Sequence, residues 1–117
     1  MNYFTETGLQ ENLVHAVQEL GFEKPTPIQA KTIPHSLSSV QDLIAFAQTG
    51  TGKTAAFGLP AIQLTNIEDK RTQTLVLCPT RELCVQITND LNSYSKYVKG
   101  LGIVAVYGGA NIETQIK

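Results

Sequence analysis

Apolar residues recur at helical spacing early in the chain and predict an amphipathic helix over residues 10–20. Steps of three and four residues place the apolar side chains on one face: Leu13, Val14, Val17 and Leu20. Gly21 follows, and glycine is the residue that most often ends a helix in a left-handed conformation. We therefore expect this helix to stop at Gly21 and to bury its apolar face.

A second, short helix is predicted to begin at Thr26. Threonine is a good N-cap, and Pro27 suits the first helical position because its fixed φ angle is already helical and its missing N–H is not needed there. Pro34 lacks the N–H that a helix interior requires, so it is expected to end or bend this helix.

Three mainly apolar runs, at residues 42–47, 74–78 and 103–107, predict buried strands. Strands of a parallel sheet read in this unbroken way because helices cover the sheet on both faces. Turn residues bound each run, and the glycines at 108 and 109 end the third. The runs therefore fit a sheet interior better than a half-exposed sheet.

Helical segments separate these runs. One is predicted from Lys53 to about residue 66, with Pro60 expected to kink it. Another is predicted from a Thr80 cap to about residue 97. Its apolar positions include Leu83, Val85, Ile87 and Leu91. The alternation of strands and helices predicts an α/β fold, a parallel sheet flanked by helices, with ligands bound beyond the carboxyl ends of the strands.

Length and charge limit the kinds of protein this chain could be, and they leave the fold prediction unchanged. The 117 residues suggest one domain at most. The formal net charge is −1, so any RNA or DNA contact must come from locally placed groups and not from an overall basic surface. The N-terminus has no basic region followed by an apolar one, and no apolar stretch approaches the roughly 20 residues that span a bilayer, so a cytoplasmic location is expected.

The two cysteines, Cys78 and Cys84, lie six residues apart with no histidine pair nearby. This is neither the spacing of a redox pair with two intervening residues nor that of a zinc site. Both stand in apolar surroundings, so we expect small buried side chains in a reducing compartment.

Residues 47–54 read Ala-Gln-Thr-Gly-Thr-Gly-Lys-Thr and carry the strongest chemical signal. With a strand before it and a helix after it, such a loop turns successive backbone N–H groups and the positive end of the helix dipole toward an anion. Lys53 would reach the outer phosphates of a nucleoside triphosphate, and the Thr54 hydroxyl would ligate Mg²⁺. Ala47 stands where the general pattern has its first glycine. The expected nucleotide contacts of this phosphate loop are Gln48, Thr49, Gly50, Thr51, Gly52, Lys53 and Thr54.

A second motif, at residues 21–29, reads Gly-Phe-Glu-Lys-Pro-Thr-Pro-Ile-Gln. These nine residues match the Q motif of DEAD-box RNA helicases, and Phe4 occupies the place of the isolated aromatic that precedes the motif in that family. Over its whole length, residues 1–117, the chain resembles the amino-terminal RecA-like domain of a DEAD-box helicase, in particular a bacterial one. The expected fold is accordingly a partial RecA-like phosphate-loop domain.

The resemblance and the chemistry of glutamine together predict an adenine nucleotide as ligand. A glutamine amide can pair with adenine N6 and N7 at once, which discriminates by about 1–3 kcal/mol. Gln29 is the residue expected to do this, with Phe4 stacking on the base and Thr26 capping its helix and touching the phosphate loop. Phe22 and Lys24 complete the expected cofactor-binding residues of the Q motif. Phe4 could instead be a core aromatic.

Residues 79–83, Pro-Thr-Arg-Glu-Leu, match motif Ia of the same family. Thr80 and the following helix start are suited to an RNA phosphate, and Arg81 adds charge and a fork of donors. The alternative is a capped helix start with a structural role alone, in which Arg81 is solvated. Further downstream, two adjacent glycines would let a nucleic-acid backbone approach closely, or would simply serve a turn. The full set expected to bind RNA is Pro79, Thr80, Arg81, Glu82, Gly108 and Gly109.

Several elements of the family are not found in this sequence. It contains no Asp-Glu-Ala-Asp tetrapeptide, whose carboxylates hold Mg²⁺ and orient the attacking water, no Ser-Ala-Thr motif and no second RecA-like domain. Lys53 and Thr54 are thus the catalytic groups present, and the 117-residue chain alone is expected to bind ATP, Mg²⁺ and RNA with negligible hydrolysis. The apolar run at residues 43–46 is expected to form an open sheet edge, which would destabilise the chain or favour a dimer or domain swap.

Two other functions remain open on the residues alone. The chain could be a non-catalytic module that binds nucleotide or RNA. It could also be another phosphate-loop ATPase or a small-molecule kinase, although such enzymes do not need the Q motif.

Overall fold

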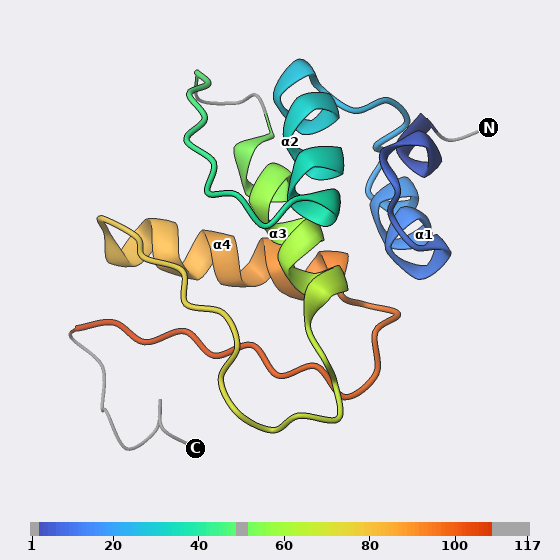
Figure 1. Ribbon diagram of the computed structural model, residues 1–117. Coiled ribbons are helices and arrows are strands. Elements are labelled where there is room, and N and C mark those ends of the chain that lie inside the picture. The colour runs from blue at the N-terminus through green and yellow to red at the C-terminus, as the bar shows by residue number, and fades with distance from the viewer. Residues whose placement is uncertain (1–2, 49–51, 109–117) are drawn as a thin grey trace.

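The computed structural model describes residues 3–48 and 52–108, and the regular structure in this part of the chain is helical (Figure 1). A 3₁₀ helix, η1, spans Tyr3–Thr7. The α-helices that follow are α1, Glu11–Glu19; α2, Pro27–Ser38; α3, Lys53–Leu64; and α4, Arg81–Tyr94. Helix α2 packs on α3, α3 packs on α4, and α1 packs on α4 and η1. None of the helices in the described residues is long and apolar enough to cross a membrane.

The core lies where these helices meet. Its largest fully buried side chains come from η1, α1, α2 and α3: Phe4, Leu13, Val17, Ile33 and Leu59. Helix α4 adds Tyr94, whose burial, together with the nearby Asp90 charge, raises the pKa of its hydroxyl to about 12. Full burial of one apolar side chain stabilises the fold by about 1.5–3 kcal/mol, so this small core supplies most of the stabilisation that comes from apolar burial.

Helix α1 confirms the first predicted helix, with one correction to its apolar face. Leu13, Val14 and Val17 are buried as expected, but Leu20 is 46% exposed. Leu20 is the C-cap residue, where the chain already turns away from the helix axis. Gly21 ends the helix with a φ of +89°, which confirms its predicted role.

Helix α2 begins as predicted and ends later than predicted. Thr26 is its N-cap and Pro27 its first residue, but the helix continues four residues beyond Pro34 to Ser38. The prediction that Pro34 could end the helix is therefore wrong. The last turn is supported locally, since Ser38 Oγ donates to the carbonyl oxygen of Pro34 at 2.7 Å.

Helices α3 and α4 confirm the two later helices but stop two and three residues earlier than predicted, at Leu64 and Tyr94. Pro60 lies inside α3 and is buried. Thr80 caps α4 as predicted, because its Oγ1 accepts from the backbone N–H of Leu83 at 3.1 Å. Val85 is 38% exposed whereas Ile87 is buried, so not all of the predicted apolar positions of α4 face the core.

A surface cluster ties the end of α1 to the turn after α4. Lys96 Nζ donates to Glu19 Oε2 at 2.9 Å, and the Tyr97 hydroxyl donates to Glu19 Oε1. These hydrogen bonds, from Lys96 first and Tyr97 second, hold the pKa of Glu19 below its ordinary value. The His15 ring stacks on Tyr97 with centroids 4.6 Å apart. Because the charges are exposed, the cluster orients the two helices more than it stabilises them.

The three predicted strands appear as extended segments without assigned strand structure. Within residues 42–47, 74–78 and 103–107 the structure assigns no strand, and among the described residues no backbone hydrogen bond joins one segment to another. In the second and third segments, exposed and half-buried residues alternate. Leu75 and Leu77 are 80% and 85% exposed, and Val104 and Val106 are each 65% exposed. An apolar run predicts burial on both faces, but these segments face helices on one side only.

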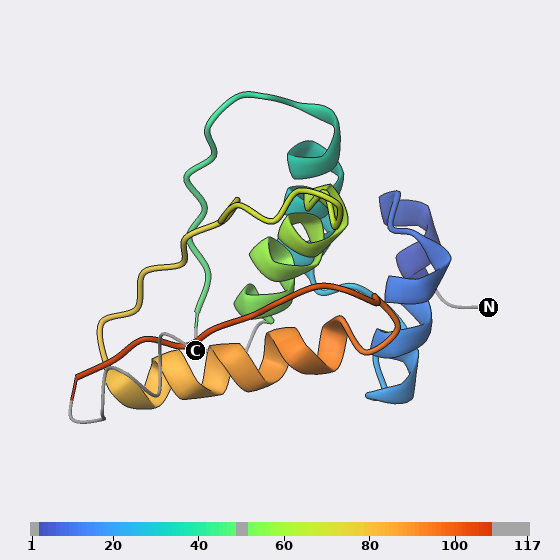
Figure 2. The same ribbon diagram turned by 90° about the horizontal axis from the view of Figure 1, so that it is seen from below.

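Two of the extended segments nevertheless run in one general direction. In both views the traces of residues 74–78 and 103–107 head toward the left side of the molecule, whereas residues 42–47 rise toward the top of Figure 1 and descend in Figure 2. The third segment lies along α4 and runs opposite to it (Figure 2). The observed architecture is therefore a set of packed helices with three extended segments, two of which share a direction, and the predicted hydrogen-bonded parallel sheet is not formed in the described residues.

Candidate functional site

Gln29 joins the Q motif to the phosphate loop. Its Oε1 accepts from the backbone N–H of Thr26 at 3.0 Å, which forms a capping box at the start of α2. Its Nε2 donates to the carbonyl oxygen of Gly52, 23 residues further along the chain, at 3.1 Å. Only 2% of Gln29 is exposed. This buried amide therefore fixes the N-terminus of α2 and the entry to α3 at the same time.

Gly52 is required by that arrangement. Its φ of +80° lies in the left-handed region, and it is the N-cap of α3. A Cβ at this position would lie 2.1 Å from Gln29 Nε2 and 3.6 Å from Thr26 Oγ1. The Q motif therefore packs directly against the end of the phosphate loop through Gln29, and the contact predicted for Thr26 stays a prediction.

The start of α3 presents the groups that the sequence predicts to bind phosphate. Lys53 is the first helical residue and is exposed, and Thr54 is half-buried beside it. Gln48 is exposed on the other side of the loop. Thr49, Gly50 and Thr51 lie outside the described residues. The backbone N–H groups of the first turn of α3 have no partner within the helix by geometry, so this end is suited to an anion.

Thr54 is the residue that the sequence predicts to hold a magnesium ion, which would arrive with a nucleotide. In the described part of the chain there is no group of three or more His, Cys, Asp or Glu side chains that could hold a metal. Mg²⁺ is commonly held by one or two protein groups together with phosphates and water. The space beside Gly52 is filled by the Gln29 amide, so phosphates and their Mg²⁺ would have to approach Thr54 from the exposed N-terminus of α3, where Lys53 lies.

Phe4 lies in the core, and Phe22 of the Q motif is half-buried against it. Phe4 has no exposed surface, and its ring stacks on that of Phe22 with centroids 6.2 Å apart. Phe22 also meets Tyr94 of α4 at 6.3 Å. Stacking of Phe4 on a base would require its ring to leave the core, so the structure favours the packing role that the sequence left open. Lys24 is exposed in the loop before α2.

The motif Ia residues gather at the N-terminus of α4. Pro79, Thr80, Arg81 and Glu82 are all exposed there. The Arg81 guanidinium lies over the ring of Tyr107, 6.0 Å from its centroid, and Gly108 follows Tyr107 on the surface. Gly109 lies outside the described residues. The structure thus brings motif Ia and the first glycine of the doublet together.

Two features of the site were not predicted from the sequence. The hydrogen bond between Gln29 and Gly52 joins residues far apart in the chain, and no local sequence pattern predicts it. Tyr107 was read only as the end of a strand, although its position beside two glycines and its ring next to the Arg81 cation make it part of the surface. Only its place directly before Gly108 could have drawn attention to it.

Comparisons with known proteins agree with this geometry. A family model described as DEAD/DEAH box helicase matches residues 26–117. The ATP-dependent RNA helicase DeaD of Escherichia coli K12 is 46% identical over 114 residues, which cover 97% of this chain and 18% of that protein. The chain therefore spans less than a fifth of the length of this curated relative.

Solved structures of related proteins have the same fold. A DEAD box protein from the hyperthermophile Methanococcus jannaschii superposes with a TM-score of 0.90 at 41% identity, covering 99% of this chain and 31% of that one. Saccharomyces cerevisiae Dbp5 bound to RNA and ADP BeF3 superposes with a TM-score of 0.81 at 32% identity, covering 93% and 29%.

Proposed function

Because this chain belongs to the DEAD/DEAH box helicase family, we propose that it supplies the adenine-nucleotide site and part of the RNA surface of an ATP-dependent RNA helicase. The observation that supports the proposal is the hydrogen bond from Gln29 to Gly52, which holds the amide proposed to read adenine against the end of the phosphate loop. Family membership argues against a small-molecule kinase or an unrelated phosphate-loop ATPase.

Adenine recognition uses the remaining capacity of the Gln29 amide. Each amide has two N–H donors and an oxygen with two lone pairs. In the structure one donor goes to Gly52 and one lone pair accepts from Thr26, which leaves one of each for adenine N6 and N7. Because only 2% of Gln29 is exposed, the residues around the start of α2 would have to open for the base to reach it. The base would lie over the start of α2, and the binding of adenine would stiffen the link to the phosphate loop.

The phosphates would lie against the N-terminus of α3. Lys53, exposed as the first helical residue, would contact the outer phosphates, and the Thr54 hydroxyl would hold Mg²⁺ bound to them. When bound, the magnesium ion supplies charge neutralisation for the phosphates. Gln48, Thr49, Gly50 and Thr51 would complete the loop around them.

A nucleotide titration of the Lys53→Ala variant tests this function. Removing the ammonium group is expected to weaken the binding of a fluorescent ATP analogue by about tenfold or more, since charge-assisted contacts to phosphate are strong. A Lys99→Ala variant, which loses the same charge from an exposed turn, should bind like the wild type. Equal affinity of all three proteins would contradict the proposal.

The chain alone should bind ATP without turning it over. The sequence contains no Asp-Glu-Ala-Asp tetrapeptide to orient an attacking water. RNA-stimulated phosphate release at a rate typical of a helicase would show that the chain carries catalytic groups beyond Lys53 and Thr54. The helicase activity itself, with a second RecA-like domain as partner, belongs to the longer proteins that this chain resembles.

RNA would bind along the surface made by motif Ia and the glycine doublet. Thr80 and the N-terminus of α4 would contact one phosphate and Arg81 a neighbouring one, with Pro79 and Glu82 beside them. Gly108 and Gly109 would let the backbone approach closely. Such contacts go to the sugar-phosphate backbone, so little sequence preference is expected.

Tyr107 is expected to orient Arg81 for this contact. A cation–π contact at an exposed position is worth about 0.5–1 kcal/mol, so Tyr107→Leu should weaken RNA binding about twofold to fivefold. Tyr107→Phe keeps the ring and should bind normally. Fluorescence anisotropy with a labelled single-stranded RNA measures both variants. An equal loss in the two would assign the effect to the hydroxyl and would contradict the ring contact.

The three extended segments are proposed to pair as a parallel sheet in the folded domain. The common direction of residues 74–78 and 103–107, and the alternation of exposed and half-buried residues in these two segments, support this pairing. Amide hydrogen exchange would then be slow in residues 43–46, 75–78 and 103–106. A dimer or domain swap through the edge at residues 43–46 stays a proposal that light scattering would test.

A further inference from the structure

Gln63 is a half-buried glutamine of α3 that holds the N-terminal turn, residues 8–10, between η1 and α1. Its Oε1 accepts from the backbone N–H of Gln10 at 2.7 Å, and its Nε2 donates to the carbonyl oxygen of Gly8 at 3.1 Å. Gln10 is the N-cap of α1. In a capping box the third helical residue accepts from the N–H of the N-cap, but Leu13 at that position has no acceptor. Gln63 therefore supplies from α3 the acceptor that α1 lacks.

The N-terminal turn is joined to the Q motif through η1. The backbone N–H of Tyr3 donates to the carbonyl oxygen of Glu23 at 2.9 Å. The Phe4 ring, which has no exposed surface, stacks on the ring of Phe22. Because η1 ends directly before the turn, a shift of the turn would also move these contacts to the Q motif.

The Q motif is thus joined to α3 at both ends of that helix. At the N-terminus of α3, Gln29 donates to the carbonyl oxygen of Gly52 at 3.1 Å. Near the C-terminus, Gln63 holds the N-terminal turn. Gln63 lies ten residues after Lys53 on the same helix, which is about 15 Å at a rise of 1.5 Å per residue. Two anchors at this separation fix the orientation of a helix, whereas one anchor leaves it free to pivot.

We propose that Gln63 is a positioning residue of the nucleotide site, which sets the Q motif against the phosphate loop from the far end of α3. The inference rests on the proposed function, which assigns adenine to Gln29 and the phosphates to Lys53. Gln63 touches neither the base nor the phosphates. It keeps the spacing between the two subsites matched to one nucleotide, so its loss lowers the preference for adenine as well as the affinity.

Gln63→Ala is expected to lower the preference for ATP over GTP about threefold. A Gln29 amide that is displaced relative to α3 cannot pair with both N6 and N7 of adenine while the phosphates stay at Lys53. Competition against a fluorescent ATP analogue, with Mg²⁺, gives the displacing concentration of each nucleotide. Their ratio separates positioning from stability, because a smaller folded fraction weakens the binding of ATP and GTP alike and leaves the ratio unchanged.

A second variant tests whether the hydrogen bonds of Gln63 matter more than its size. Gln63→Glu keeps the shape of the side chain and the acceptor for the N–H of Gln10. At neutral pH it places a carboxylate oxygen against the carbonyl oxygen of Gly8, where the wild type has a donor. The ATP preference of this variant should fall as it does in Gln63→Ala. A wild-type ratio in both variants would overturn the proposal.

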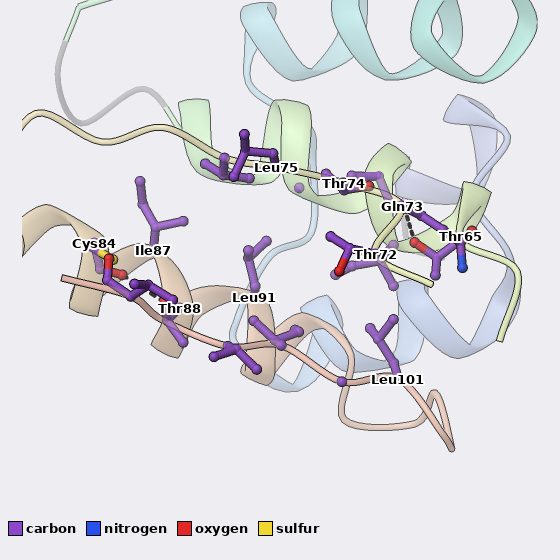
Figure 3. A pocket seen from close by; sticks show the side chains of 18 of the residues that line it. Thr65, Thr72, Gln73, Thr74, Leu75, Cys84, Ile87, Thr88, Leu91 and Leu101 are labelled. Atoms are coloured by element: carbon purple, nitrogen blue, oxygen red, sulfur yellow. Dashed lines mark hydrogen bonds between the residues drawn. The ribbon is translucent and has the colours of Figure 1, made fainter. Parts of the chain in front are cut away.

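Gln73→Ala is the matched control. The Gln73 amide accepts from the N–H of Asn66 at 2.9 Å and donates to the carbonyl oxygens of Asn66 and Asp69 at 2.8 and 3.1 Å. Gln73 lies beside an open cavity of about 990 Å³ between α3, α4 and the extended segments, with Thr65 nearby (Figure 3). Within the described chain its side-chain hydrogen bonds stay inside residues 66–73. The control therefore loses a bonded amide without loosening the Q motif, and its ATP preference should equal that of the wild type.

Amide hydrogen exchange tests the link through η1 without any nucleotide. Exchange in residues 3–10 and 21–26 should be faster in Gln63→Ala than in the wild type and unchanged in Gln73→Ala. Unchanged exchange in residues 21–26 of Gln63→Ala would overturn the link. Faster exchange with a wild-type ratio of ATP to GTP would overturn its role in the nucleotide site. If the wild type itself does not prefer ATP although exchange responds as expected, the proposed function fails at Gln29, and the link stands without a role in base selection.

Discussion

Replacing Gly52 with alanine is expected to abolish measurable nucleotide binding by this chain. The φ of +80° at this position costs a residue with a side chain about 1–2 kcal/mol. The new methyl group would also lie 2.1 Å from Gln29 Nε2, so the buried amide would have to move and its hydrogen bond to Gly52 would break. Titration with a fluorescent ATP analogue measures the loss.

Two further glycine variants separate the causes. Gly21 also has a positive φ, of +89°, but a Cβ there would meet nothing within 4 Å, so Gly21→Ala tests backbone strain without a clash. Gly102→Ala introduces neither strain nor a contact. Both should keep nucleotide affinity, and Gly21→Ala should lower only the melting temperature. Normal nucleotide binding by Gly52→Ala would show that the link between the Q motif and the phosphate loop is not needed.

Leu59→Ala is expected to cause the largest loss of stability in the chain. Leu59 is fully buried in α3, the helix that presents Lys53 and Thr54. Truncating such a leucine costs about 2–5 kcal/mol, a large share of the roughly 5–15 kcal/mol that stabilises a typical domain. Urea unfolding followed by circular dichroism at 222 nm measures the change.

Leu64→Ala is the matched control, because Leu64 ends the same helix and is 60% exposed. Its change in unfolding free energy should stay within about 0.5 kcal/mol. Similar losses in the two variants would mean that α3 does not pack in solution as it does in the structure. If Leu59→Ala also loses nucleotide binding, we expect the loss to follow from unfolding and not from a missing contact.

The helices were predictable because their signals are local. Thr26 and Thr80 each cap a helix because each stands directly before a helical pattern of apolar residues. Gly21 ends a helix because it directly follows such a pattern. The ends were less predictable. Pro34 did not stop α2, since Ser38 supplies a hydrogen bond to the last turn and the helix packs on α3.

The strands depended on contacts that a pattern does not contain. Leu75, Leu77, Val104 and Val106 read as interior residues, yet each is mostly exposed, because burial of both faces needs cover on both faces. The same limit applies to the site. Gln29 and Gly52 could each be assigned to a motif, but their hydrogen bond depends on how α2 packs on α3. Phe4 is the opposite case: the motif assigned its ring to stacking on a base, but the structure buries the ring in the core.

A competition titration tests most directly whether this phosphate loop, together with Gln29, forms an adenine-nucleotide site. ATP and GTP, each with Mg²⁺, would displace a fluorescent ATP analogue from the wild-type chain. A bidentate amide–adenine pair is worth about 1–3 kcal/mol, so ATP should displace the probe at about tenfold lower concentration than GTP. Displacement by both at the same concentration, or binding of neither, would contradict the site built on Gln29, Gly52 and Lys53.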